Sequence, residues 1–242
     1  MMGSFPYFLF SAGEICYNKS TMGNYKKKRK KYITVAASLV LSASLLAGCG
    51  NVKKQNAYKQ KGIAAMEDED YKKALSYFNK ALKESGGRIT AREADICYYK
   101  ATAQYRLNKP GAALATLGSL EDYHKDDANA SFLKGMIYAD TGKAKKAFEA
   151  LESACRTSGE NEMYEKAYVY LIAADLSGQA EQFYMIMPGE ARASENVLRQ
   201  RVLLYEKQAD YKKAYQAAKK YLKQYPQDED MQDEAEFLKS RL

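Results

Sequence analysis

The chain has 242 residues, of which 38 are Lys or Arg and 30 are Asp or Glu, and its formal net charge is +8. Seven of these cations, but only one acid, Glu14, precede residue 49, which leaves 31 cations and 29 acids in the rest of the chain. The basicity belongs mostly to the first 48 residues, so net charge gives no reason to expect a nucleic-acid partner.

Residues 1–21 precede a second methionine, Met22, that lies close to a basic run. Their aromatic stretch at residues 5–10 is interrupted by Pro6 and is too short to span a bilayer. We interpret residues 1–21 as an N-terminal extension that arises from a mis-assigned start codon.

Residues 22–48 have the organisation of an export signal. Six consecutive cations at residues 26–31 are followed by the apolar segment from Tyr32 to Ala47, and small residues then precede Cys49. The apolar segment has 16 residues, whereas a spanning helix needs roughly 20. The pattern therefore favours a signal peptide over a transmembrane helix.

The tetrapeptide at residues 46–49, Leu-Ala-Gly-Cys, resembles the lipobox of bacterial lipoprotein signals at every position. The resemblance implies that the Cys49 thiol receives a diacylglycerol, that cleavage occurs before it, and that two acyl chains anchor the mature protein. We then expect a cell-membrane location that faces away from the cytoplasm, with residues 49–56 as a lipidated linker. Gly50 is not the acidic residue that resembles an inner-membrane retention signal, so outer-membrane sorting is open in a two-membrane cell. An ordinary secretory signal that happens to end in Cys is the alternative.

Small residues recur after the linker with a period near 34. The alanines Ala74, Ala113 and Ala147 are 39 and 34 positions apart, and in two copies the alanine lies twelve positions after a glycine, Gly62 or Gly135. Glycine inside a helix costs about 1 kcal/mol relative to alanine, so these glycines need a packing reason. We expect each to let its helix approach the next one closely, near that helix's alanine.

The spacing of these residues resembles the tetratricopeptide repeat, whose pattern places small residues at positions 8, 20 and 27. The resemblance implies an all-α, right-handed superhelical solenoid of about five antiparallel helix pairs over residues 57–227. One of these pairs is a degenerate copy at residues 164–187, and the last clear copy surrounds Ala214. Residues 228–242, acidic first and basic last, are expected to form a C-terminal capping helix. A generic α-helical bundle is the alternative.

In the family that this chain resembles, the first helix of each pair forms an inner wall that holds peptide segments. By register, this wall would contain Lys59, Ile63, Met66, Tyr98, Thr102, Tyr105, Phe132, Met136, Ala139, Arg199, Leu203 and Glu206. Because aromatic residues and arginine dominate binding hot spots, the candidate partner-binding residues are Lys59, Tyr98, Tyr105, Arg106, Phe132, Met136 and Arg199. The alternative is that Tyr98, Tyr105 and Phe132 fill the core between repeats.

One subtype of the family grips a terminal carboxylate with a lysine followed by asparagines. This chain has Lys59 at the lysine position but Ile63 at the next one, and Thr102 in the second unit. The wall is therefore expected to favour apolar or aromatic side chains over a terminal carboxylate.

Two cysteines beyond Cys49, Cys97 and Cys155, lie in no metal-binding pattern, so no metal is expected. We predict two buried, unpaired thiols, with one disulfide as the alternative. The sequence contains no Gly-rich phosphate loop, GxSxG or HExxH motif. We therefore expect a protein that is not an enzyme and needs no cofactor: a membrane-anchored scaffold of the bacterial cell envelope that binds an unidentified protein or peptide. An accessory subunit of an envelope hydrolase, or a cryptic hydrolase, is the alternative.

Overall fold

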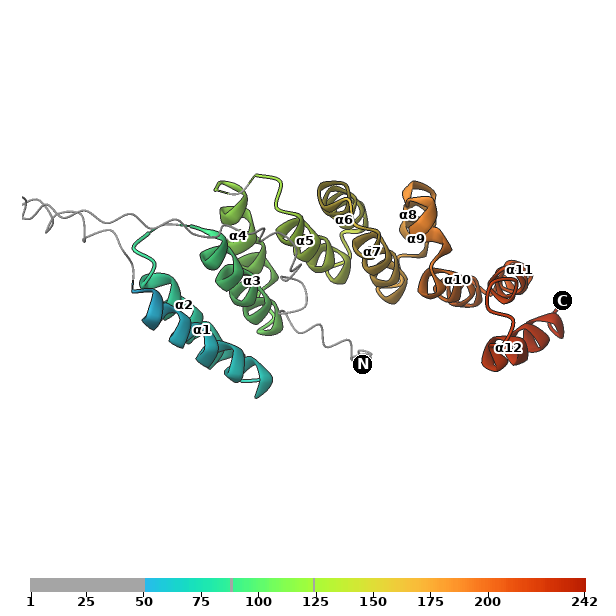
Figure 1. Cartoon of the computed structure of the whole chain (residues 1–242), viewed down its shortest axis with the longest axis horizontal. Coiled ribbons are helices and arrows are strands. Elements are labelled where there is room, and N and C mark those ends of the chain that lie inside the picture. The colour runs from blue at the N-terminus through green and yellow to red at the C-terminus, as the bar shows by residue number, and fades with distance from the viewer. Residues whose placement is uncertain (1–50, 88, 124) are drawn as a thin grey trace, which may run out of the picture. The chain divides into compact units, whose positions relative to one another are not determined.

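A computed structural model describes residues 51–87, 89–123 and 125–242, and the signal and lipidation predictions lie outside them. Over these residues the regular structure is entirely helical, with twelve helices (Figure 1). The chain divides into two compact units, Met1–Thr116 and Leu117–Leu242. The all-α prediction is confirmed.

The first unit holds α1 (Val52–Glu67), α2 (Tyr71–Lys83), α3 (Ala91–Arg106) and the start of α4 (Pro110–Glu121). Helix α1 packs against α2 and α3, and α2 also packs against α3. Their shared core is built from the buried side chains of Ala65, Ala74, Phe78, Ala81, Ile96, Tyr99 and Ala103. The rings of Phe78 and Tyr99 stack within this core, with centroids 5.7 Å apart.

Helix α1 begins inside the segment that the sequence predicts as a linker, so the linker prediction for residues 52–56 is corrected. The Asn51 side chain caps the helix by accepting from the Lys54 backbone N–H at 3.0 Å. One turn later Gln55 is 1% exposed, and its amide donates to the buried Glu93 carboxylate of α3 at 2.6 Å. This buried hydrogen bond holds the first turn of α1 against α3.

Two glycines allow close approach of paired helices, as predicted, but their contacts differ from the expected ones. A Cβ at Gly62 would lie 2.4 Å from the Phe78 ring, and one at Gly135 would lie 2.6 Å from Cγ of Leu151. The close contact is thus with the large residue four positions after each repeat alanine, and not with the alanine itself. That large side chain fills the space left by the missing Cβ.

The second unit contains the end of α4 and the remaining helices: α5 (Ala128–Asp140), α6 (Ala144–Ser158), α7 (Asn161–Ala173), α8 (Ser177–Ile186), α9 (Gly189–Ala193), α10 (Glu195–Lys207), α11 (Tyr211–Leu222) and α12 (Glu229–Lys239). Three pairs pack together, α5 with α6, α7 with α8, and α10 with α11. The first helices α5, α7 and α10 contact one another in order, and the second helices α6 and α8 also touch. This arrangement repeats one hairpin along the unit.

The turn within each pair repeats in conformation as well as in position. One residue has a left-handed backbone, with φ between 54° and 71°, in every case: Glu69, Asn108, Gly142, Asp175 and Ala209. The next residue in each turn donates its backbone N–H to the carbonyl oxygen five positions earlier, at 2.8 to 3.0 Å. The degenerate copy between α7 and α8 therefore keeps the repeat geometry even where its sequence pattern is weak.

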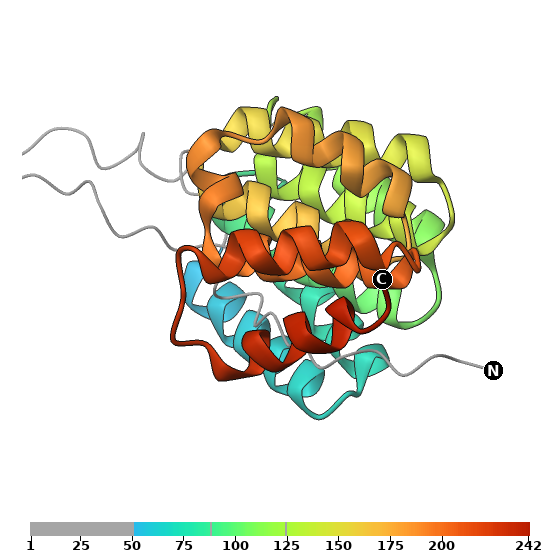
Figure 2. The same ribbon diagram turned by 90° about the vertical axis from the view of Figure 1, so that its right-hand side faces the viewer.

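Two elements complete the C-terminal part of the chain. The short helix α9 follows Pro188, where the sequence suggests only a terminator, and it packs against α7 and α10. Helix α12 is capped by Asp228 and packs on α11 through the predicted Met231, Ala235 and Leu238 (Figure 2). Its acidic first turn and basic last turn suit the helix dipole.

Cys97 and Cys155 are both buried and unpaired, as predicted. Burial raises the pKa of both thiols, that of Cys155 to about 12. Within the described residues, no helix combines the length and apolarity needed to cross a membrane.

Candidate partner-binding site

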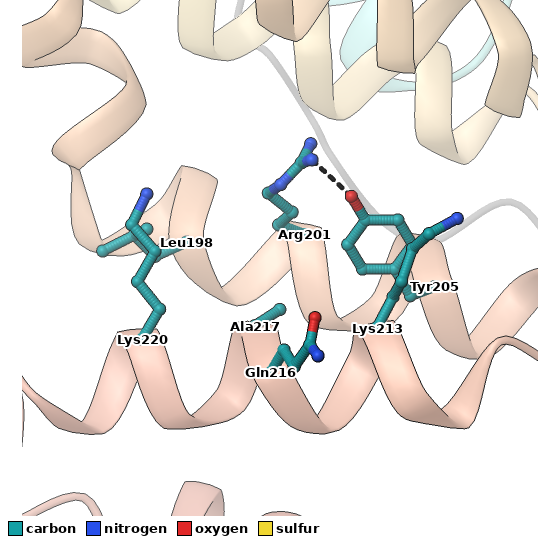
Figure 3. A pocket seen from close by; sticks show the side chains of 7 residues that line it. All are labelled: Leu198, Arg201, Tyr205, Lys213, Gln216, Ala217 and Lys220. Atoms are coloured by element: carbon teal, nitrogen blue, oxygen red, sulfur yellow. Dashed lines mark hydrogen bonds between the residues drawn. The ribbon is translucent and has the colours of Figure 1, made fainter.

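Helices α8 to α11 enclose two adjoining hollows, which we call the basic cleft. The first has a volume of about 280 Å³ and is lined by Leu198, Arg201 and Tyr205 of α10 and by Lys213, Gln216, Ala217 and Lys220 of α11 (Figure 3). The second, also about 280 Å³, is lined by Tyr184, Gly189, Arg192, Ala193, Lys220 and Gln224. Lys220 lines both, so the two hollows adjoin at its side chain.

The cleft is positively charged. Its lining includes the cations Arg192, Arg201, Lys213 and Lys220, and none of the described residues that line it is acidic. Glu181 and Asp210 contact the cations from outside the lining, Glu181 at 3.4 Å from Arg201 and Asp210 at 2.9 Å from Lys213. The site therefore keeps more positive than negative charge.

Arg201 is the most enclosed of the four cations. Its guanidinium lies 3.8 Å from the ring centroid of Tyr184 and 4.9 Å from that of Tyr205, and it donates to the Tyr205 hydroxyl. Burial alone would lower its pKa, but interactions with the Tyr168 and Tyr205 hydroxyls and the Glu181 carboxylate outweigh burial, so the pKa of Arg201 is raised. Two tyrosine rings and a carboxylate thus fix a permanent positive charge at the floor of the cleft.

The sequence of α11 positions the other charged residues. Ala214, Ala218 and Tyr221 are fully buried, and they set which face of the helix turns inward. The neighbouring stripe of Lys213, Gln216 and Lys220 lines the cleft, because residues three or four apart share one side of a helix, and Gln224 joins it from the turn after α11. The Lys220 ammonium reaches the Tyr184 hydroxyl of α8 at 3.4 Å.

Known proteins resemble this chain both in sequence and in fold. Residues 98–162 match the family model described as tetratricopeptide repeat. A crystal structure of a tetratricopeptide repeat protein from Parabacteroides merdae shares 15% identity with the chain and has a TM-score of 0.55, covering 77% of this chain and 72% of that one. Residues 98–162 are thus tetratricopeptide repeat sequence, and the described residues have a tetratricopeptide-like helical solenoid fold.

Two further structures share the tetratricopeptide-like helical solenoid fold. Pseudomonas aeruginosa pilF aligns with 78% of this chain and 90% of its own, at 15% identity and a TM-score of 0.52. MamA aligns with 71% of this chain and 91% of its own, at 16% identity and a TM-score of 0.51. Curated protein sequences include no match to this chain.

In the first unit, the predicted tetratricopeptide wall residues have different environments. Tyr98 is 9% exposed, whereas Tyr105 is half-buried and Arg106 is exposed. Lys59 forms an ion pair with Asp95 of α3, and its ammonium lies 5.7 Å from the Tyr99 ring centroid. The other wall positions in this unit are half-buried: Ile63, Met66 and Thr102. Arg106 is therefore the exposed residue among the candidates in this unit.

In the second unit, the wall prediction falls largely on core and network positions. Phe132 is 5% exposed and belongs to the core cluster with Leu151 and Tyr168, against which the half-buried Met136 packs. Ala139 is buried, and Leu203 is 40% exposed. For Phe132 the environment matches the core-filling alternative, and the structure gathers none of these residues into the basic cleft.

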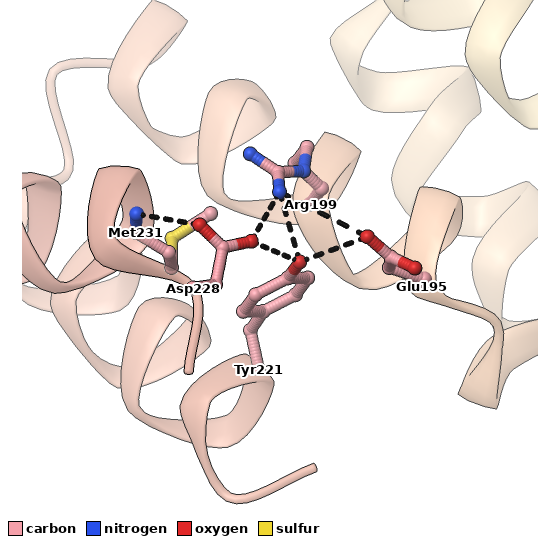
Figure 4. A network of polar contacts seen from close by, with 5 residues as sticks. All are labelled: Glu195, Arg199, Tyr221, Asp228 and Met231. Atoms are coloured by element: carbon pink, nitrogen blue, oxygen red, sulfur yellow. Dashed lines mark hydrogen bonds and ion pairs between the residues drawn. The ribbon is translucent and has the colours of Figure 1, made fainter. Parts of the chain in front are cut away.

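Arg199 lies in a polar network that joins α10 to α11 and α12 (Figure 4). Its guanidinium donates to the Tyr221 hydroxyl at 2.9 Å, pairs with Asp228, and lies 3.9 Å from Glu195. The same hydroxyl lies 2.5 Å from Asp228 and 3.1 Å from Glu195. The hydrogen bond from Tyr221, with one from the Met231 backbone, lowers the pKa of Asp228. Arg199 therefore has a stabilising role within the repeat array.

The basic cleft was not among the predicted sites, although part of its signal is present in the sequence. Once Ala214, Ala218 and Tyr221 are assigned to the inward face, the positions of Lys213 and Lys220 beside that face follow from helical spacing. The contribution of Arg192 depends on α9, which no repeat pattern indicates. Tyr184 likewise lies in the degenerate copy, where the sequence register is weakest.

Proposed function

We propose that this tetratricopeptide repeat protein is a membrane-anchored scaffold that binds a protein partner in the bacterial cell envelope. The observation that carries the binding role is the repeat architecture itself, because stacked helix pairs form extended surfaces for recognition. The lipobox-like residues 46–49, which follow a basic run and an apolar segment, support the anchored location.

The anchor is tested by metabolic labelling with an alkyne analogue of palmitate, followed by membrane fractionation. We expect label on the wild-type chain and its loss, together with release from membranes, in Cys49→Ser. The matched control is Cys97→Ser, an unpaired cysteine outside the predicted lipidation site, which should leave labelling and membrane retention unchanged. Retention of unlabelled Cys49→Ser protein at wild-type levels would contradict the anchor.

The scaffold role is tested in cells with a photo-crosslinking amino acid placed at exposed positions of the full chain. Arg106 represents the predicted wall and Lys220 the basic cleft, while Glu149 on α6 is a control that is also exposed. We expect a discrete protein adduct from Arg106 or Lys220 and none from Glu149. Absence of an adduct at both test positions would overturn the proposal.

A further inference from the structure

We infer that the basic cleft binds an extended acidic segment of a partner protein, with carboxylate side chains at two positions about three residues apart. This inference rests on the proposed protein-binding function and specifies the chemistry of the partner. Its residues come from α8 to α11, with a stripe of α11 as one wall. The site is therefore separate from the wall of first helices that the sequence predicts, for which apolar ligands were expected.

Charge identifies the ligand as an anion. Among the described residues, Lys220 and Arg192 form no ion pair, and both line the cleft. The Lys220 ammonium has a tyrosine hydroxyl as its neighbour at 3.4 Å, which leaves its charge available. Hydrogen bonds from ammonium or guanidinium groups to a carboxylate are roughly twice as strong as those between neutral groups. A carboxylate of a partner could therefore accept hydrogen bonds from Lys220 and Arg192, which pair with no carboxylate among the described residues.

The spacing along α11 fits a peptide in an extended conformation. Lys213 and Lys220 are seven residues apart, which is about 10 Å along a helix at 1.5 Å per residue. Side chains three residues apart on a polyproline II segment point the same way and are separated by about 9 Å. Two glutamates with two residues between them therefore match the two lysines, one at Lys220, which has no carboxylate partner among the described residues, and one at Lys213, which also pairs with Asp210.

The amide side chains of the stripe suit a peptide backbone. Gln216 lies between the two lysines (Figure 3). Gln224 follows Lys220 in the lining of the second hollow, so amides and ammonium groups alternate in sequence along the cleft. A glutamine amide both donates and accepts, so it can pair with the N–H and C=O groups of an extended chain. Lys213 to Lys220 span about 10 Å of helix, which accommodates about three extended residues, and Gln224 follows the end of α11 at Leu222.

The tyrosines argue against a single-stranded nucleic acid as the ligand. Sequence-tolerant binding of nucleic acids uses exposed aromatic faces on which bases stack. In the cleft, the guanidinium of Arg201 lies over the rings of both Tyr184 and Tyr205, at 3.8 and 4.9 Å from their centroids. The rings therefore hold the arginine in place and leave recognition to charge and hydrogen bonding.

The experiment measures fluorescence anisotropy of a labelled peptide with the full chain in detergent. The probe contains two glutamates separated by proline and serine, and the matched probe replaces both glutamates with glutamine. We expect the acidic probe to bind at least tenfold more tightly than the glutamine probe. The difference should shrink as salt is raised, because exposed charges are screened.

The variants test whether the cleft is responsible. Lys220→Gln and Arg192→Gln should each weaken binding of the acidic probe at least fivefold. The controls Lys212→Gln and Lys219→Gln remove the same charge from exposed positions of α11 outside the cleft lining, and they should change binding less than twofold. Circular dichroism monitors the folding of each variant.

Three outcomes would overturn the inference. These are equal binding of the two probes, equal weakening by cleft and control variants, and Lys220-dependent binding of phosphatidylglycerol vesicles in place of the acidic probe. Crosslinking from Arg106 in the Lys220→Gln, Arg192→Gln double variant separates the two proposals. If the double variant still gives the partner adduct and the acidic probe does not bind the cleft, the acidic-ligand inference is wrong and the scaffold proposal stands.

Discussion

Gly62 and Gly135 show how one missing Cβ sets the distance between paired helices. In each case the space is filled by a large side chain of the partner helix, the Phe78 ring or the Leu151 side chain. Phe78 and Leu151 are themselves fully buried, so neither can move without disturbing the core around it. The glycine requirement is therefore a packing requirement and not a matter of backbone conformation.

Gly62→Ala should lower the stability of the first unit. Overpacking a core costs about 1–3 kcal/mol, and alanine recovers about 1 kcal/mol through helix propensity, so the free energy of unfolding should fall by up to about 2 kcal/mol. Urea denaturation followed by circular dichroism measures this change. Gly178→Ala in α8 is the control, because its added Cβ meets nothing within 4 Å. A loss as large in Gly178→Ala would contradict the packing argument.

Individual side chains were the part of the site that sequence could least predict. The repeat register correctly places Phe132 and Arg199 on first helices, but exposure depends on what neighbouring elements bring to them. Arg199 meets Asp228 and Tyr221, which lie 29 and 22 residues away in sequence. No local sequence pattern shows that Arg199 of α10 will form an ion pair with Asp228, the N-cap residue of α12.

At the scale of elements, one tyrosine hydroxyl links α10, α11 and α12. Tyr221→Phe keeps the ring in the core but removes the hydroxyl that contacts Arg199, Asp228 and Glu195. We expect a loss of about 1–2 kcal/mol for these partly buried hydrogen bonds, with faster amide exchange in α12. Tyr225→Phe, which changes a half-buried ring 4.9 Å from that of Tyr221, is the control. Unchanged exchange in α12 of Tyr221→Phe would show that the network does not hold the helix.

The docking of α12 should also weaken in acid. The pKa of Asp228 is lowered in the folded chain, so its ionised form is favoured by folding. Its contribution is present above the ordinary pKa of 3.8 and is lost as the pH falls through the lower folded value.

Glu206 of α10 has the opposite pH dependence. Burial, together with a hydrogen bond to Glu234 and that residue's charge, raises its pKa from 4.5 to about 7. The folded chain therefore holds a proton that the unfolded chain releases, so this contribution to stability falls as pH rises from 4.5 to about 7.

Glu206→Gln should consequently stabilise the protein above pH 7, by about 1 kcal/mol after allowing for partial exposure, and have little effect at pH 4. Thermal denaturation at the two pH values measures the difference. Glu236→Gln, an exposed acid on α12, should give the same stability as wild type at both. An effect of Glu206→Gln that is the same at both pH values would contradict the raised pKa of Glu206.

Helix pairs and their turns were predictable because they depend on local sequence. The recurring alanines indicate which residues of α2, α6 and α11 face their partners, and these alanines are fully buried. Elements that depend on tertiary contacts were not predictable. The first turn of α1 is held by the hydrogen bond from Gln55 to Glu93 of α3. Helix α9 follows Pro188, where the repeat pattern predicts the end of a unit.

At the scale of the whole molecule, stability is distributed along the chain and does not depend on one central core. Within each unit, the helix contacts join elements that are close in sequence, such as α1 with α2, α5 with α6 and α11 with α12. Repeat arrays of this kind gain stability from each hairpin and from its nearest neighbours. This locality follows from the period that the sequence displays, which is why the fold was the most predictable property.

A local perturbation should therefore stay local. In Gly62→Ala, amide exchange should rise in α1, α2 and α3 and remain at wild-type rates in α10, α11 and α12. Hydrogen exchange with peptide-level mass spectrometry measures both regions in one sample, so the C-terminal helices are an internal control. A uniform rise across all helices would instead indicate one cooperative unit.

The cap at Asn51 bears on how a lipidated chain would sit. Only two residues separate Cys49 from the first turn of α1, a reach of about 7 Å, which is close to the depth of the headgroup layer on one side of a bilayer, about 5–7 Å. Lys53 and Lys54 are exposed in that first turn, where the helix dipole disfavours cations. Attraction of these two lysines to lipid phosphates, about 1 kcal/mol per lysine, would compensate for that cost. In a lipidated chain the first turn of α1 would therefore lie on the bilayer surface.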